Sequence, residues 1–376
     1  MIRENARNKK CKYKTIRFYL LRALPFGARN AVFTFGATAR ALECILICLF
    51  YVVTAQYVDD FPQFEAEDLA GEADDIMIDV LELLGWEVKM PEGVPPKFDQ
   101  VFTLLGVRMH LDLHHEGAVT VTNKKERAAK ICADVERIIR AGKAIPSEIA
   151  AMRGSLNFAK AQCFGRCGAA SLCFMSEAVR CGPVHLDAAA IEHLRFWPRY
   201  FENAKPRTVR YVDGRPPALI FTDGAEEGAI GVGGILLDEA VAGAEYFGGI
   251  DDDKIIRGWL AEGNKQRAIH QAEVYPALIA LELWAERLRG RRVLLFVDND
   301  AAKECLIKGT TRSKASAKLV SDFWCRAAEY ELYIWVERVA SAANPADAPS
   351  RRACPELTQR GIPRRCASEY GVRPYV

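Results

Sequence analysis

The sequence predicts mixed α+β and α/β structure, with its best-defined region in a mixed β-sheet flanked by helices. Three apolar segments, around residues 218–225, 228–237 and 243–250, have the length and turn signals of strands joined as an antiparallel meander. Helices and strands then alternate along the following sequence. Three consecutive strands followed by such an alternation indicate one sheet that contains both antiparallel and parallel neighbours.

The overall composition is that of an ordinary soluble globular protein. The chain has 376 residues, of which 50% are hydrophobic and 27% charged, so it is long enough for two or three domains. The formal net charge of +2 gives no global argument for nucleic-acid binding, and any binding surface must therefore be locally basic.

The twelve cysteines are scattered singly along the chain. They lack the paired spacing of a zinc site, which favours buried or surface thiols instead. No secretory signal is visible, so we expect an intracellular protein with reduced cysteines. The apolar run 44–55 is too short to span a bilayer and reads as core, so we expect no membrane partner.

A helix is predicted after residue 122, because Ala128, Ile131, Val135 and Ile138 form one apolar stripe. Thr122 or Asn123 is a candidate cap for this helix. Basic residues lie largely off the stripe, where they favour either phosphate contacts or a solvated face; they are Lys124, Arg127, Lys130 and Arg137. The basic first seventeen residues leave the same two interpretations open.

Four carboxylates occupy distinctive positions in the predicted sheet region. Asp223 ends the first strand, and Glu273 lies at the front of an amphipathic helix whose first turn takes in Pro276. Asp298 ends the strand RVLLFVDND, while Pro345 and Pro349 hold Asp347 in a turn. Taken singly, each reads as a surface or capping residue. A buried carboxylate nevertheless has to be hydrated, paired or bound to metal.

The order strand-Asp, helix-Glu, strand-Asp, turn-Asp resembles the ribonuclease H domain of retrotransposon reverse transcriptases. The resemblance implies that Asp223, Glu273, Asp298 and Asp347 hold two Mg²⁺ or Mn²⁺ ions, with Asp223 bridging both. It also implies cleavage of RNA within an RNA–DNA hybrid. Many family members carry a histidine shortly before the last aspartate, where it is proposed to assist product release or proton transfer, and the segment VERVASAANPAD has none.

Upstream, two motifs resemble the polymerase palm of the same enzymes. LPFG, with Gly27 as a nucleic-acid-binding residue, precedes an apolar-rich helical segment. LFYVVTAQYVDDF looks like the catalytic hairpin, which would make Tyr57, Asp59 and Asp60 the polymerase site, with the two aspartates binding metal. The segment 81–111 resembles the strands that close the palm, with Lys89 or Lys97 as the palm lysine.

The family's first palm motif is missing from this resemblance. Only about 20 residues precede LPFG, and they contain no aspartate. A truncated palm without fingers is therefore expected not to polymerise by itself. Two alternatives remain open: a non-catalytic nucleic-acid-binding relic, and a polymerase completed by a partner or by an upstream segment. The resemblance implies that the chain binds an RNA–DNA hybrid, DNA or RNA. It does not predict the oligomeric state.

The expected organisation has five parts. They are a basic N-terminal arm (1–20), a partial palm (21–115), a helical thumb- or connection-like region (116–205), a ribonuclease H-like domain (206–352) and a C-terminal tail (353–376). The ending VASAANPADAPSR and the direct order of these parts look like LTR-type or DIRS-like retroelements.

Overall fold

The computed structural model shows two compact units, residues 1–99 and 100–376, which are treated separately. The residues that it describes are 29–86, 98–162, 165–182, 184–211, 213–227, 229–241, 243–251, 253–263, 269–311, 313–351, 353–370 and 372–373. The basic arm, LPFG with Gly27, and both candidate palm lysines lie outside these ranges.

The first unit contains α1 (Arg29–Phe50) and α2 (Ala70–Leu83), joined by a hairpin. Its small core combines Leu42 and Leu46 of α1 with Met77, Val80 and Leu81 of α2. The prediction that the run 44–55 is core is wrong for most of its residues. The run begins as the last two turns of α1, and a helix buries only one of its faces.

Helix α1 also bears on the expected absence of a membrane partner. The stretch Asn30–Phe50 is long and apolar enough to cross a bilayer, by length and composition alone, and only 22% of it is buried. A single such helix near an N-terminus is weak support for a membrane span, because core helices and signal sequences meet the same criterion.

The second unit begins with an antiparallel sheet in the order β1-β2-β3-β6. Its strands are β1 (Val101–Leu104), β2 (Val107–His110), β3 (Ala118–Asn123) and β6 (Arg207–Arg210). Within the described residues of the predicted palm-closing segment 81–111, β1 and β2 are strands, whereas residues 81–83 belong to α2.

Between β3 and β6 lies the predicted helical region. It comprises α3 (Lys125–Ala141), β4 (Lys143–Ala144), α4 (Pro146–Ala159), α5 (Ala169–Cys181), β5 (Val184–His185) and α6 (Ala188–Asn203). The predicted stripe on α3 is confirmed at Ile131, Val135 and Ile138, which are buried in this region's own core.

The predicted cap of α3 is wrong. Lys124 is the N-cap residue and forms no side-chain capping bond. Asn123 instead donates through its backbone N–H and its side-chain amide to Gln162, and through the amide to the Ala159 carbonyl. Because Gln162 is 7% exposed and needs partners, Asn123 satisfies that buried group rather than the helix end.

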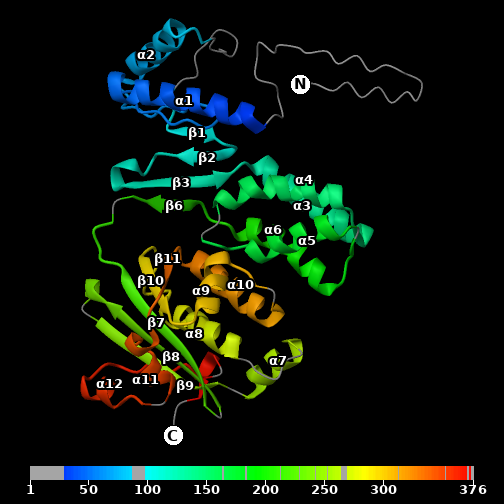
Figure 1. Ribbon diagram of the computed structural model, residues 1–376, viewed down its shortest axis with the longest axis vertical. Coiled ribbons are helices and arrows are strands. Elements are labelled where there is room, and N and C mark those ends of the chain that lie inside the picture. Colours follow the sequence, from blue (N-terminus) through cyan, green and yellow to red (C-terminus); the bar gives the residue numbers. More distant parts are fainter. Residues whose placement is uncertain are drawn as a thin grey trace, which may run out of the picture. The chain divides into compact units, whose positions relative to one another are not determined.

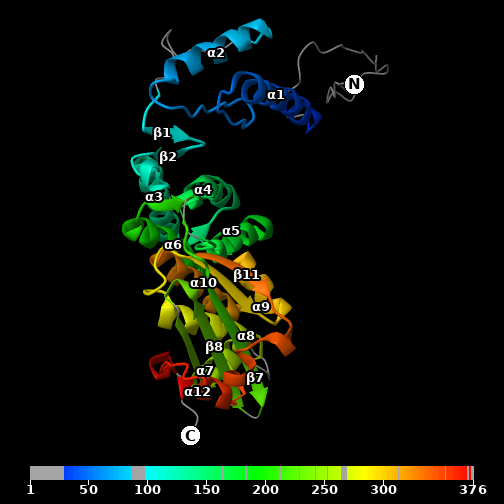
Figure 2. The ribbon, with the colours of Figure 1, turned by 90° about the vertical axis from the view of Figure 1, so that its left-hand side faces the viewer.

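The remaining strands form a mixed sheet in the order β11-β10-β7-β8-β9-β12 (Figure 1 and Figure 2). The strands are β7 (Ala218–Glu227), β8 (Ala229–Asp238), β9 (Gly243–Asp251), β10 (Arg292–Val297), β11 (Tyr333–Arg338) and β12 (Val372–Arg373). β7, β8 and β9 form the predicted antiparallel meander, and β10 runs parallel to both β7 and β11. The predicted mixed α+β and α/β fold class, with its mixed β-sheet and flanking helices, is confirmed.

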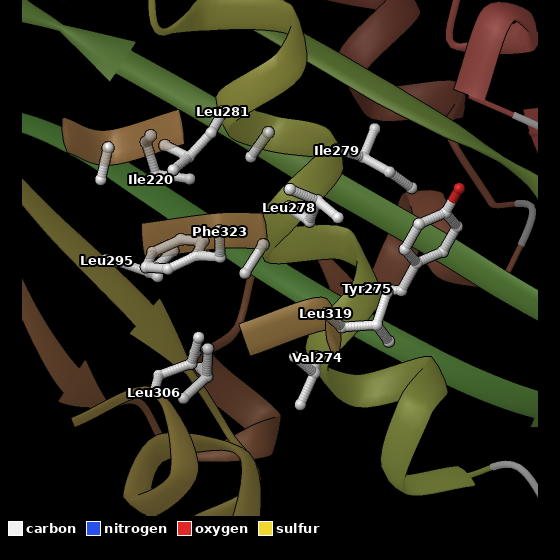
Figure 3. Close-up of a cluster of buried hydrophobic side chains, with 14 of the residues drawn as sticks. Ile220, Val274, Tyr275, Leu278, Ile279, Leu281, Leu295, Leu306, Leu319 and Phe323 are labelled. Atoms are coloured by element: carbon white, nitrogen blue, oxygen red, sulfur yellow. The ribbon is translucent and has the colours of Figure 1, made fainter. Parts of the chain in front are cut away.

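Helices cover both faces of this sheet. They are α7 (Asp253–Gly263), α8 (Ile269–Trp284), α9 (Asp300–Lys308), α10 (Lys314–Glu329), α11 (Asp347–Ser350) and α12 (Pro355–Gln359). Figure 3 shows the main core, where Ile220 and Leu295 of the sheet meet Leu278 of α8 and Phe323 of α10. α11 lies on the opposite face, against β8 and β9.

Pro276 lies inside α8 and not in its first turn, contrary to the prediction, because the helix begins at Ile269. A proline has no N–H, so the Ala272 carbonyl loses its usual bond within the helix. That carbonyl oxygen faces β7 so closely that a Cβ atom on Gly224 would lie 2.1 Å from it. The glycine therefore permits the close packing of α8 on the end of β7.

Candidate metal centre at the carboxyl end of the mixed sheet

Asp223 lies in the middle of β7, two positions beyond Phe221, the last residue of the strand that pairs with β10, and is 4% exposed. The prediction that the first strand ends at Asp223 is wrong, because β7 continues to Glu227 by pairing with β8. The Ser350 hydroxyl, on α11, donates to its Oδ2 atom. Burial raises the pKa of Asp223 to about 6; the Ser350 bond opposes this rise, and the charges of Asp298 and Asp347 add to it. Asp223 is thus a buried carboxylate among other carboxylates.

Glu273 reaches the same place from α8. Burial, followed by the charges of Asp223 and Asp298, raises its pKa to about 8. Asn299 opposes this rise through a hydrogen bond to the carboxylate. The oxygen of Asn299 accepts from the Ala302 N–H as the N-cap of α9. Its amide N–H₂ is therefore the part that can donate to Glu273.

Asp298 follows β10, the parallel neighbour of β7. One carboxylate oxygen from each of Asp223, Glu273 and Asp298 lies within 4.8 Å of the others. In the described part of the chain, no lysine or arginine forms an ion pair with any of these three. Carboxylates this close repel one another unless a cation neutralises them, so the donor set fits a hard divalent ion.

Asp347 borders this trio without belonging to it. It begins α11, and the Arg351 Nε atom donates to its Oδ1 atom over 2.6 Å. Its charge adds to the raised pKa of Asp223, and the Ser350 hydroxyl that donates to Asp223 lies 2.9 Å from the Asp347 carbonyl oxygen. The structure therefore brings together three of the predicted carboxylates within ligand distance, with the fourth beside them and paired to an arginine.

Glycines on β8 and β9 determine how closely α11 approaches Asp223. A Cβ atom would lie 2.0 Å from the Ser350 carbonyl oxygen if placed on Gly231, and 2.5 Å from the Ser350 nitrogen if placed on Gly233. On Gly248 it would lie 2.7 Å from the Pro349 carbonyl oxygen. Asn344 also anchors the loop, because its side-chain amide donates to the Thr222 carbonyl, one residue before Asp223.

Several of these residues were not identified from the sequence. Ser350, Asn299 and Arg351 contact the predicted carboxylates, yet each looks like an ordinary loop or cap residue when read singly. From the sequence, the glycines of GVGG are predicted only to belong to a strand. The alternate spacing of Gly231 and Gly233 is the signal for a close neighbour, since alternate strand residues share a face and small residues there leave room for it.

The predicted polymerase residues lie in the first unit. Tyr57 and Asp60 exchange backbone hydrogen bonds of 2.9 and 3.0 Å, which closes the expected hairpin around Val58 and Asp59. Both aspartates are exposed. Val58 has φ 55°, a left-handed conformation that is costly for a β-branched residue.

The predicted basic contacts on α3 divide into two kinds. Lys124 and Lys130 are exposed. Arg127 instead donates to the Gly106 carbonyl and lies over the Phe158 ring, with 5.4 Å between its guanidinium carbon and the ring centroid. Arg127 therefore has structural partners on β-sheet and helix, whereas the two lysines point their charges to solvent.

Comparisons with known proteins give distant structural likenesses only. No family model matches the chain, and no curated protein matches its sequence. RNase H1 from the halophilic archaeon Halobacterium salinarum is 18% identical over 38% of this chain and 99% of its own, with a TM-score of 0.30. The N-terminal RNase H domain of a Mycobacterium tuberculosis protein is 16% identical, covering 39% and 99%, with a TM-score of 0.26.

A foamy viral protease–reverse transcriptase in complex with double-stranded DNA covers more of the chain. It is 13% identical over 84% of this chain and 50% of its own, with a TM-score of 0.39. This chain therefore spans about half the length of that viral protein. At these values, likeness alone assigns neither an activity nor a substrate.

Proposed function

We propose that the chain is a metal-dependent nuclease that hydrolyses the RNA strand of an RNA–DNA hybrid. The observation that carries the proposal is the convergence of Asp223, Glu273 and Asp298 within 4.8 Å of one another. These residues come from an antiparallel strand, a helix and a parallel strand of a ribonuclease H-like sheet. Asp223 is buried and the other two are partly buried, and among the described residues none of the three forms an ion pair with a lysine or arginine. Clustered carboxylates of this kind are the ligands that phosphoryl-transfer metals require.

The proposed ligands are Asp223, Glu273 and Asp298, with Asp347 as the fourth. Two Mg²⁺ or Mn²⁺ ions bound there would supply charge neutralisation and Lewis acidity for phosphodiester hydrolysis. Ser350 holds the Asp223 carboxylate in one orientation, and Asn299 does the same for Glu273. Arg351 pairs with Asp347 and so reduces the net negative charge around the three other carboxylates.

Lys124 and Lys130 are proposed contacts to the hybrid backbone. Exposed lysines contribute affinity through phosphates and carry no sequence information, which suits an enzyme that acts on any hybrid. A retroelement origin is part of the proposal, since both the palm-like motifs and the carboxylate order resemble those enzymes.

The exposed aspartates of the hairpin favour a second candidate, a nucleotidyltransferase site completed by another segment or chain. Asp59 lies in the two-residue turn and Asp60 pairs with Tyr57 at its base, so a cation can reach both exposed carboxylates. Two-metal chemistry also needs a carboxylate from outside this hairpin. Primer extension on an RNA template, with and without Asp60→Asn, tests this candidate separately from hydrolysis.

The main experiment measures cleavage of a hybrid labelled on either strand, with Mg²⁺, with Mn²⁺ and with chelator. We expect cleavage of the RNA strand alone, loss of activity with chelator, and a loss of at least about 100-fold in Asp223→Asn. Asp300→Asn is the matched control, because Asp300 is exposed beside the site and pairs with Arg338 over 3.3 Å. Tight hybrid binding without metal-dependent cleavage would contradict the nuclease proposal and favour the non-catalytic nucleic-acid-binding relic.

A further inference from the structure

The sequence GRCG, residues 165–168, forms a tight turn between α4 and α5 that packs against the mixed-sheet region. Gly165 has φ 52° and Gly168 has φ 81°, conformations that favour glycine. A Cβ atom on Gly165 would lie 2.0 Å from the Trp324 ring, on α10. The turn therefore needs glycine both for its backbone and for its close approach to α10.

The two residues between these glycines make the contacts. The Arg166 Nε atom donates to the Ile307 carbonyl over 2.8 Å, near the end of α9. A Cβ atom on Gly309, which follows that helix, would lie 2.3 Å from the Arg166 Cβ atom. The turn is thus packed against α9 and α10, with little space between them.

Cys167 is 6% exposed, and its Sγ atom lies 3.8 Å from that of Cys325, on α10. Both thiols are reduced, and Cys325 is partly exposed. The two sulfurs are in contact although 158 positions separate the residues. A disulfide would require the sulfurs to approach to about 2.0 Å, a movement within the reach of side-chain rotation and small shifts of the turn.

We propose that Cys167 and Cys325 are a site of reversible oxidation, at which hydrogen peroxide forms a disulfide that joins the helical region to the mixed-sheet region. The Cys325 thiolate attacks a peroxide oxygen, which gives a sulfenic acid and one water. The Cys167 thiol then attacks that sulfur, forms the S–S bond and releases a second water. Two electrons pass from the thiols to the peroxide, and both thiol protons leave in the waters.

Cys325 is the attacking residue for two reasons. It is the more exposed member of the pair, so peroxide reaches it first. The hydrogen bond with Cys167 also lowers the pKa of the Cys325 thiol, although burial opposes that change. Oxidation at this pair is independent of the carboxylate site, and its test does not depend on nuclease activity.

The experiment treats the purified chain with hydrogen peroxide, alkylates remaining thiols, digests with trypsin without reduction, and identifies linked peptides by mass spectrometry. We expect a peptide that joins residues 167–180 to residues 319–326 and that disappears after dithiothreitol. Because residues 167–180 also contain Cys173, the mapping is repeated in Cys173→Ser, where the link must persist. The oxidised chain should also unfold at a higher temperature, reversibly with dithiothreitol.

Cys325→Ser should abolish both the linked peptide and the thermal shift. Cys305→Ser is the matched control, since Cys305 is a buried thiol on α9 of the mixed-sheet region, and it should change neither. The proposal is overturned if peroxide oxidises the exposed Cys181 while Cys167 and Cys325 are both recovered as alkylated thiols in separate peptides. It is equally overturned if Cys325 pairs with the peptide that contains Cys163.

Discussion

The Ser350 hydroxyl donates a hydrogen bond to the Asp223 carboxylate, although 127 positions separate the two residues. The same hydroxyl oxygen lies 2.9 Å from the Asp347 carbonyl oxygen, so one serine touches the backbone of one candidate ligand and the side chain of another. A hydroxyl has a single proton, so it cannot donate fully to both oxygens at once. Ser350 therefore couples the position of α11 to the orientation of Asp223.

We predict that Ser350→Ala weakens the metal site more than the fold. Removing the hydroxyl leaves a buried carboxylate without its donor, which costs about 1–3 kcal/mol. Mn²⁺ affinity should fall by about 10-fold to 100-fold, the range for residues that orient metal ligands. Calorimetric titration with Mn²⁺ measures this directly, without reference to activity.

Ser341→Ala serves as the control, because Ser341 is an exposed serine of the same loop. It should leave Mn²⁺ affinity unchanged. Equal Mn²⁺ affinities for Ser350→Ala and the unmodified chain would show that the Ser350 bond does not orient Asp223 for metal binding.

A second prediction concerns the close approach of β7 and α8. In Gly224→Ala the new methyl group would lie 2.1 Å from the Ala272 carbonyl oxygen, so strand and helix must separate. We expect a loss of about 1–3 kcal/mol in unfolding free energy and a displaced Glu273. Denaturant unfolding gives the free energy, and the Mn²⁺ titration reports on Glu273.

Gly154→Ala is the matched glycine substitution. Gly154 lies within α4, and a Cβ atom there meets nothing within 4 Å. Because alanine is a better helix former, this change should stabilise the chain by up to about 1 kcal/mol. A loss of stability in both variants would mean that crowding at Gly224 is not the cause.

How much of the fold and of the candidate site the sequence predicts depends on how far apart in the chain the interacting residues are. The meander, the helix after Glu273 and the strand before Asp298 follow from local periodicity, and all are present. Parallel pairing of β10 with β7 then brings Asp298, which follows β10, beside Asp223, although β7 itself continues past Asp223 to Glu227. Local pattern therefore predicts most of the elements that carry the site.

The contacts that orient the site are not readable in this way. Whether Asn123 caps a helix or binds Gln162 depends on a residue 39 positions away. Pro276 also depends on a distant residue. It leaves the Ala272 carbonyl without its usual bond within α8, and this position packs closely on β7 because Gly224 lies opposite that carbonyl. Such choices depend on tertiary packing, which short-range propensity does not contain.

A third prediction concerns the buried ion pair at the other end of the sheet. Asp238 accepts two hydrogen bonds from the Arg291 Nη1 atom, at 2.6 and 2.7 Å, and the side chains are 1% and 6% exposed. Asp238→Ala leaves the guanidinium buried without its partner, and we expect a loss of about 3–5 kcal/mol in unfolding free energy. Asp322→Ala breaks the exposed pair with Lys318 and should cost less than about 1 kcal/mol.

A fourth prediction tests the basic face of α3. If Lys124 and Lys130 contact phosphates, replacing both with glutamine should lower the slope of log affinity against log salt by about two units. Filter binding to a hybrid at several salt concentrations measures this slope. Replacing Lys308 and Lys318, exposed lysines already paired with carboxylates, is the control. An unchanged slope would return α3 to the solvated-face interpretation.

The last prediction follows from the raised pKa values of the carboxylate site. An acid whose pKa rises on folding keeps its proton in the folded chain, so its contribution to stability is present below the unfolded pKa and is lost as pH rises through the folded value. For Glu273 that window runs from about pH 4.3 in the unfolded chain to about pH 8 in the folded chain. For Asp223 the window ends at about pH 6.

In chelator, the unfolding free energy should therefore fall between pH 5 and pH 8, by an amount on the order of a few kcal/mol. Glu273→Gln should flatten this decline, because glutamine cannot ionise, while Glu286→Gln at an exposed position should leave it unchanged. Mg²⁺ or Mn²⁺ binds the ionised carboxylates, so saturating metal should restore stability most at pH 8. Denaturant unfolding across this range, with and without metal, measures all three effects. A decline that persists undiminished in Glu273→Gln would remove Glu273 as its source and, with it, the main electrostatic argument for a cation at this site.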